Sequence, residues 1–299
     1  LLEKYRNIKD RALPFESIAK SVHDDSLELD RAREAFSRLP LKWTRGYNLT
    51  TGKELLIPFD WFFTINEFNG TSAGNCQEEA ILQGICEVVE RHVSSIISLN
   101  RVKTPAIDLS STDDPLVLEL IRKYKKEGIK LYVSDFSLNT GIPSIGVLAY
   151  DPSTFPARSE IVWTAGTTPD PEKALSRALT EVAQLAGDFD TASRYVASGL
   201  PKLTRIEDAE FIINPGERID IHTLPVLSND NIKIEVENCI SALAKQGLEV
   251  IVVDTKHPLL DIPAFYTIIP GAHFRERAIE TSVAMFAAKI ITENKRPNR

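Results

Sequence analysis

The chain has 299 residues, of which 43% are hydrophobic and 26% are charged, an ordinary composition for a globular protein large enough to bury a full core. Its formal net charge of −7 argues against a broad nucleic-acid-binding surface, and no apolar run approaches the roughly 20 residues that span a bilayer. The sequence begins at Leu1 and shows no signal-peptide pattern, so we expect a cytoplasmic protein that is a fragment or a processed chain.

The cysteines and histidines give no sign of a disulfide framework or of a structural zinc site. The three cysteines are odd in number and form no C-x-x-C motif, and the five histidines show no spacing such as H-x-x-x-H. This usage fits a reducing compartment. Cys76 is expected to be buried or to lie in a capping loop, because nothing near it in the sequence reads as a base for its thiol.

The first 40 residues read as a polar, helical lead-in. Residues 43–59 predict two strands around a turn at 50–53, because Gly52 readily supplies the positive φ that such a turn needs. A loop rich in Gly, Ser and Asn is expected over residues 69–75.

A strong helix is predicted over residues 77–99. Asn75 stands where a cap is expected, and Glu78 lies in the first turn, where the helix dipole favours carboxylates. One stripe of the helix is apolar and consists of Ala80, Ile81, Gly84, Ile85 and Val88. The opposite stripe is polar and consists of Glu79, Gln83, Glu87 and Glu90.

Helices and strands alternate over the rest of the chain. The further helices are expected over residues 115–127, 171–185, 236–246 and 276–293. The further strands are expected over residues 129–133, 144–149, 161–164, 248–253 and 265–269. This order predicts an α/β or α+β fold with mixed strand directions. Because no low-complexity linker interrupts the sequence, we expect a single domain over residues 1–299, with its core at about 41–275.

Two pairs of segments resemble each other. The helix at 77–99 aligns with the helix at 171–185 at a constant offset, so that Glu87 matches Glu181. Residues 127–135 align in the same way with residues 246–254, each reading helix, glycine, strand, aspartate. One such match is explained by similar packing of a helix, a glycine and a strand. Two matches in the same order along the chain indicate that the two halves of the fold arose by duplication. A duplicated fold tends to bind its ligand between the halves.

The helical carboxylates favour a cation site. The second helix places Arg177, Glu181 and Gln184 on the face that corresponds to the polar stripe of the first. Carboxylates that converge repel each other, by about 4 kcal/mol per pair at about 4 Å, and a divalent cation removes this cost. Hard oxygen ligands favour magnesium over zinc. The alternative is a solvated helix face with an internal salt bridge.

The segment at 71–91, TSAGNCQEEAILQGICEVVER, strongly resembles the signature of the YcaO family, in which a Ser/Ala/Gly loop precedes an apolar helix that closes in E-x-x-E-R. Residues 45–58 resemble the strand pair of this family, R-G-x-x-L-x-T-G followed by V-P. Residues 174–184 resemble its A-L-T-E-x-x-Q helix, and residues 261–271 resemble its third block. The resemblance therefore covers about residues 40–275.

The resemblance implies a YcaO-like fold that binds ATP and Mg²⁺ without a Walker loop, through carboxylates of the two helices. The nucleotide-binding positions that it implies here are Glu79, Glu87, Glu90, Arg91, Glu181, Gln184, Ser72, Gly74, Lys9 and Ser17. The metal ligands among them are Glu87, Glu90, Glu181 and Gln184. Arg275 and Arg277 are further candidates for a phosphate contact. The catalytic residues stay unknown.

The resemblance also implies a reaction, in which ATP phosphorylates a peptide amide oxygen and an azoline or a thioamide forms. The chain lacks the Pro-x-Pro-x-Pro tail of many cyclising members and has Ala186 where many members have Arg. The missing tail weakens the azoline assignment or indicates a missing C-terminal extension. Two alternatives stay open: an ATP-binding accessory protein, as in ribosomal-protein methylthiolation, and a binding module that uses no nucleotide. The expected partners are a peptide or protein substrate and a protein for substrate recognition or sulfur delivery, with no nucleic acid and no membrane; a homodimer is left open.

Overall fold

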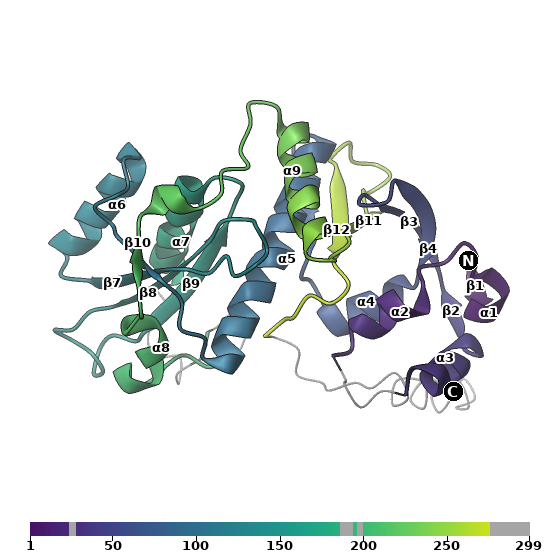
Figure 1. Cartoon of the computed structure of the whole chain (residues 1–299), viewed down its shortest axis with the longest axis horizontal. Coiled ribbons are helices and arrows are strands. Elements are labelled where there is room, and N and C mark those ends of the chain that lie inside the picture. Colours follow the sequence, from purple (N-terminus) through teal and green to yellow (C-terminus); the bar gives the residue numbers. More distant parts are fainter. Residues whose placement is uncertain (24–27, 186–193, 196–199, 276–299) are drawn as a thin grey trace. The chain divides into compact units, whose positions relative to one another are not determined.

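The chain divides into two compact units. A computed structural model describes residues 1–23, 28–185, 194–195 and 200–275. The described part of unit 1 consists of Leu1–Val88 without its gap and of Gly247–His273. The described part of unit 2 consists of Val89–Gln246 without its gaps and of residues 274–275. Each unit contains a five-stranded sheet, and some strands of each sheet are labelled in Figure 1. The single domain predicted over residues 1–299 stays a prediction, and the helix predicted at 276–293 lies outside the described residues.

Unit 1 is built on an antiparallel sheet. Its elements are β1 (Leu2–Lys4), α1 (Tyr5–Ile8), α2 (Phe15–Lys20), α3 (Leu29–Ser37), β2 (Pro40–Lys42), β3 (Thr44–Asn48), β4 (Lys53–Ile57), α4 (Phe59–Asn66), β5 (Thr71–Ala73), α5 (Gln77–Asn100) up to Val88, β11 (Ile251–Asp254) and β12 (Ala264–Ile268). The strand order is β4-β3-β11-β12-β5, and every pair is antiparallel. The predicted lead-in is mostly helical but also contains β1, which pairs with β2.

The predicted hairpin of unit 1 is confirmed, whereas the predicted loop at 69–75 contains a strand. β3 and β4 pair from Asn48 opposite Lys53 onward, and Gly52 has a φ of 70°. β5 pairs with β12 because Gly70, at a φ of 91°, lets the chain approach the sheet: a Cβ there would lie 2.3 Å from the carbonyl oxygen of Thr267. Only glycine tolerates both conditions.

One aromatic core joins the helices of unit 1 to its sheet. The ring of Phe36 packs edge-on against Trp61 and tilted against Phe15, with centroid distances of 5.8 and 5.4 Å. Tyr266 of β12 belongs to the same cluster, and its burial raises the pKa of its hydroxyl. On the apolar stripe of α5, a Cβ at Gly84 would lie 2.3 Å from the Thr267 hydroxyl oxygen, so this glycine lets the helix lie directly on β12.

Unit 2 is built on a mixed sheet. Its elements are α5 from Val89 onward, β6 (Ala106–Ile107), α6 (Pro115–Lys126), β7 (Lys130–Asp135), β8 (Ser144–Tyr150), β9 (Val162–Thr167), α7 (Pro171–Leu185), η1 (Ile206–Ala209), α8 (Glu210–Ile213), β10 (Arg218–Ile219), η2 (Ile221–Thr223) and α9 (Ile232–Lys245). The strand order is β10-β6-β7-β8-β9, in which the β10–β6 pair is parallel and the others are antiparallel. Apolar residues of α7 pack on β8 and β9. The prediction of mixed strand directions in an α/β fold is confirmed.

One order of elements occurs twice in the chain, and the second copy includes elements of both units. In the first copy, α6 is followed along the chain by Gly128, at a φ of 76°, and then by β7. In the sheet β7, β8 and β9 are neighbours, and α7 follows β9 along the chain. In the second copy, α9 is followed along the chain by Gly247, at a φ of 71°, and then by β11. In the sheet β11, β12 and β5 are neighbours, and α5 follows β5 along the chain. The repeats seen in the sequence therefore correspond to equivalent elements. The prediction that a ligand binds between the halves stays a prediction.

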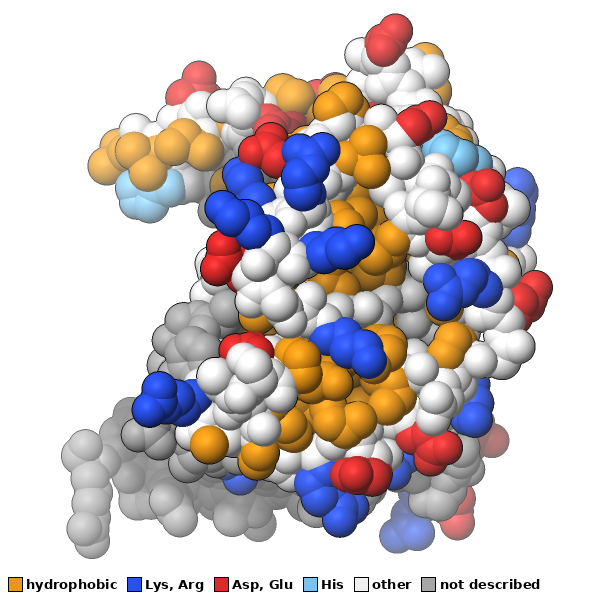
Figure 2. Space-filling model, turned by 90° about the vertical axis from the view of Figure 1, so that its left-hand side faces the viewer, with side chains coloured by type: hydrophobic (Ala, Val, Ile, Leu, Met, Phe, Trp, Pro, Cys, Tyr) orange, Lys and Arg blue, Asp and Glu red, His pale blue; other side chains and the backbone are white. Residues whose placement is uncertain are grey.

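Basic residues gather at the C-terminal end of α6. Figure 2 faces the side of Figure 1 on which α6 lies, and it shows Lys and Arg side chains among hydrophobic and acidic ones. The last turn of α6 alone carries Lys123, Lys125 and Lys126, where they complement the negative end of the helix dipole.

No helix in the described part of the chain is long and apolar enough to cross a bilayer. The three cysteines are all described and all are free thiols; Cys76 is exposed.

Candidate functional site

A cavity of about 150 Å³ lies within unit 2 and contains four of the predicted site residues. Its walls come from α5, β9, α7 and three further residues of the unit. The lining residues are Glu90, Arg91, Ser94, Trp163, Thr164, Ala165, Glu181, Leu185, Tyr195, Leu200 and Arg275. The structure therefore brings Glu90, Arg91, Glu181 and Arg275 together around one space.

Glu90 is the most buried charged group of this cavity. It lies on α5 and is only 8% exposed, although the sequence also allowed a solvated helix face. Its Oε2 lies 3.9 Å from Nε of Arg177 on α7. A buried carboxylate needs such a partner, because an uncompensated charge in the interior costs several kcal/mol. The alternative of a solvated face is therefore wrong for Glu90.

Glu181 reaches the cavity from α7. This helix begins after Asp170, whose Oδ1 accepts the backbone N–H groups of Glu172 and Lys173 as a cap. Its apolar face is fully buried and consists of Ala174, Leu175, Ala178, Leu179 and Val182. Glu181 lies beside this face and is half-buried, so its carboxylate faces the cavity without being part of the core. Gln184 is exposed and is not among the residues that line the cavity.

Trp163 and Arg275 form the aromatic wall of the cavity. The guanidinium carbon of Arg275 lies 4.7 Å from the centre of the Trp163 ring, a cation–π contact. The Tyr195 hydroxyl accepts the backbone N–H of Trp163 at 2.9 Å and donates to its carbonyl oxygen at 3.2 Å. Trp163 is buried, and it also lines the cavity. The sequence gives no signal for this second role, because a tryptophan in a strand reads as core.

The charges of the cavity fit Mg²⁺ and phosphate. Glu90 and Glu181 supply the carboxylate oxygens that Mg²⁺ prefers, and Arg91 and Arg275 supply guanidinium groups that bind phosphate oxygens. At about 150 Å³ the cavity is smaller than the roughly 300–1,000 Å³ of a typical small-molecule pocket. A volume of this size corresponds to only part of a nucleotide-binding site.

Two predicted site residues of unit 1 have structural roles at the start of α5. Oε2 of Glu79 accepts the backbone N–H of Asn75 at 2.6 Å and its side-chain amide at 2.9 Å, which fixes the loop before the helix. A Cβ on Gly74 would lie 2.7 Å from the backbone nitrogen of Ala80, so this position requires glycine for close packing. These contacts explain both residues without a nucleotide.

The other predicted residues of unit 1 stay predictions. Ser72 is buried in β5, and its hydroxyl donates to the carbonyl oxygen of Phe265 at 3.5 Å. Lys9 is exposed at the C-terminus of α1, and Ser17 is half-buried in α2. Glu87 is half-buried on α5, three residues before Glu90 and therefore on the same face of the helix.

The sequence matches a family model described as YcaO cyclodehydratase, ATP- and Mg²⁺-binding, over residues 1–273. A curated relative, the ribosomal protein S12 methylthiotransferase accessory factor YcaO of Escherichia coli K12, is 28% identical over 228 residues, which are 72% of this chain and 38% of that protein. Among solved structures, the heterocyclase TruD matches with a TM-score of 0.69 and 27% identity over 93% of this chain and 40% of its own. YcaO from Methanopyrus kandleri, bound with AMPPCP and Mg²⁺, matches with a TM-score of 0.64 and 27% identity over 81% of this chain and 67% of its own.

The chain is shorter than the curated proteins that it matches. It spans 65% and 61% of two uncharacterized relatives, from Methanothermobacter thermautotrophicus and Rhizobium leguminosarum, and 38% of the E. coli protein.

Proposed function

Because the chain belongs to the YcaO family, we propose that it is an enzyme that uses ATP and Mg²⁺ to activate a backbone amide of a peptide or protein. The observation that carries this proposal is the cavity of unit 2, where Glu90 and Glu181 from two helices lie with Arg91 and Arg275. The M. kandleri relative with bound AMPPCP and Mg²⁺ supports the choice of cofactors, and the heterocyclase relative supports the reaction class.

The proposed reaction solves a leaving-group problem, because an amide oxygen is a very poor leaving group. A thiol or hydroxyl of the substrate adds to the amide carbon and loses its proton, and the amide oxygen takes the γ-phosphoryl group of ATP, releasing ADP. Loss of phosphate and of the amide proton then gives an azoline; an external sulfur nucleophile gives a thioamide by the same activation. In this chain Glu90 and Glu181 would hold Mg²⁺, and Arg91 and Arg275 would orient the phosphates. Bound Mg²⁺ supplies neutralisation of the phosphate charge.

The second candidate function is that of an ATP-binding accessory protein. It is favoured by the E. coli relative, whose name is that of an accessory factor of a ribosomal-protein methylthiotransferase. Both candidates need the same cavity and differ in whether this chain itself turns over an amide. Product analysis with a candidate peptide separates them. A peptide or protein substrate and a partner protein for recognition or sulfur delivery belong to both proposals, and a homodimer is left open.

We expect ATP binding that depends on magnesium. Titration calorimetry with ATP and Mg²⁺ should give binding heat, and EDTA should abolish it, because the carboxylates and the phosphates repel each other without the cation. ATP without metal is the control. An absence of heat at millimolar nucleotide would sink both candidate functions.

We expect Glu90→Gln to reduce the stabilisation that ATP and Mg²⁺ provide. At a ligand concentration 100 times its Kd the gain should be about 2.7 kcal/mol, or roughly 5–10 °C in the melting midpoint of the native chain. The neutral amide is a poorer magnesium ligand, so the shift of the variant should be smaller. Glu237→Gln, which makes the same change at an exposed position of α9, is the matched control. Equal ligand-dependent shifts in all three proteins would show that Glu90 does not bind the cofactors.

A further inference from the structure

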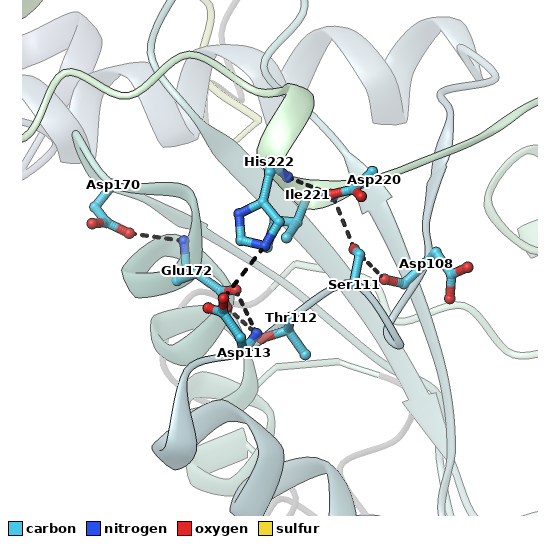
Figure 3. Close-up of polar contacts among 9 residues, drawn as sticks. All are labelled: Asp108, Ser111, Thr112, Asp113, Asp170, Glu172, Asp220, Ile221 and His222. Carbon is cyan, nitrogen blue, oxygen red and sulfur yellow. Dashed lines mark hydrogen bonds and ion pairs between the residues drawn. The ribbon is translucent and has the colours of Figure 1, made fainter.

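A second group of potential ligands lies in unit 2, apart from the cavity. It consists of Asp113, Glu172 and His222, which are drawn in Figure 3. Their ligand atoms all lie within 4.8 Å of one another. None of the three lines the cavity. Glu172 and Glu181 are nine residues apart on α7, which corresponds to about 14 Å along the helix at 1.5 Å per residue.

The three residues come from separate segments that hydrogen bonds hold together. Glu172 lies in the first turn of α7, where its carboxylate accepts the hydroxyl of Thr112 and, at 3.1 Å, the backbone N–H of Asp113. The backbone N–H of Ile221 donates to the Ser111 hydroxyl at 3.0 Å, which ties η2 to the same loop. The ligand atoms therefore meet on a backbone that is already fixed, the condition for a site of defined geometry.

His222 is oriented toward the two carboxylates. Its backbone N–H donates to Oδ1 of Asp220 at 2.8 Å, and its Nε2 lies 3.9 Å from Oδ2 of Asp113. Asp113 and Glu172 supply two carboxylates beside this imidazole. Two carboxylates this close repel each other, and a cation between them and the imidazole nitrogen would remove the repulsion.

We propose that Asp113, Glu172 and His222 bind one divalent transition-metal ion, with Zn²⁺ as the ion that these ligands fit best. An imidazole nitrogen with two carboxylate oxygens is a donor set for zinc, whereas magnesium and calcium take oxygen donors. Three protein ligands leave the fourth tetrahedral position to water. The ion would link the loop before α6, the first turn of α7 and η2, so its role is to stabilise unit 2, independently of the proposed function.

The sequence pattern does not reveal this site. Structural zinc sites are found in sequences by short ligand spacings, whereas these ligands are spread from residue 113 to residue 222. Only the packing of η2 against the start of α7 brings His222 to the carboxylates.

The test is titration of metal-free, nucleotide-free protein with zinc, in a Cys76→Ser background because the exposed Cys76 thiol also binds zinc. We expect one Zn²⁺ per chain, a higher melting midpoint with zinc, and a visible absorption band when Co²⁺ is used instead. His222→Ala should weaken zinc binding at least about tenfold, since even indirect partners of a ligand change metal affinity about 10–100-fold. It should also remove the zinc-dependent rise in melting midpoint.

Two control variants make the result specific. His257→Ala removes an exposed histidine of unit 1 and should leave zinc affinity unchanged. Glu181→Gln alters the cavity and should also leave it unchanged, which separates this site from the proposed ATP site. Zinc affinity that is the same in His222→Ala as in the parent, a loss of binding in Glu181→Gln, or no zinc uptake by the parent would each overturn the proposal.

Discussion

Replacement of Glu181 by alanine should lower ATP turnover by at least about 100-fold, which corresponds to about 2.7 kcal/mol of transition-state stabilisation. Glu181 lines the cavity of unit 2 together with Glu90 and two arginines, so its removal takes a carboxylate ligand away from the proposed cation. The fold should persist, because the buried residues that hold α7 on its sheet are the neighbouring apolar ones. Glu87→Ala should have the same effect if the signature residues of α5 act as the family resemblance implies.

The measurement is the rate of ADP release with saturating ATP and Mg²⁺, together with the melting midpoint of each variant. Glu237→Ala, at an exposed position of α9, is the control for loss of a helical carboxylate and should leave turnover unchanged. Near-native turnover in Glu181→Ala at an unchanged melting midpoint would show that the cavity is not the ATP site.

Gly166→Ala should destabilise unit 2 by about 1–3 kcal/mol, the usual cost of overpacking a core. A Cβ at this position of β9 would lie 2.4 Å from the carbonyl oxygen of Ala174 and 2.7 Å from the backbone nitrogen of Ala178. These are backbone atoms of α7, so no side-chain rotation relieves the clash and the helix itself has to move. Because α7 carries Glu181, we expect turnover to fall as well.

The check is thermal unfolding, in which a loss of 2 kcal/mol corresponds to roughly 4–8 °C. Gly216→Ala is the matched control, because a Cβ there meets nothing within 4 Å and the position is exposed. An unchanged midpoint in Gly166→Ala would mean that the contact between β9 and α7 is less tight than the structure shows.

The elements that the sequence predicts best are those stabilised by their own periodicity. The helix predicted at 171–185 has these bounds in the structure, because apolar residues at helical spacing define both its face and its length. The strand β5 is missed because three residues in a loop of Gly, Ser and Asn become a strand only by pairing with β12, about 190 residues later. Local sequence carries no signal for such a partner.

The candidate site was predictable to a similar extent. The repeat of helical carboxylates and the family signature lead to Glu90 and Glu181, and the structure brings both to one cavity. The burial of Glu90 depends on Arg177 of another helix, and the wall formed by Trp163 depends on Arg275 from far along the chain. Such roles arise from tertiary packing, which periodicity does not encode.

The strand order of unit 1 has a consequence for synthesis of the chain. β11 and β12 lie between β3 and β5 in the sheet, yet the ribosome makes them after all of residues 89–246. At a synthesis rate of about 5–20 residues per second, the inner edges of β3 and β5 stay unpaired for roughly 10–40 s after residue 88 has been made, until β11 and β12 are synthesised. Unpaired strand edges are sites of aggregation. We therefore expect the sheet of unit 1 to be exposed to aggregation for longer during translation than the sheet of unit 2, whose strands lie within residues 106–219 and are made earlier.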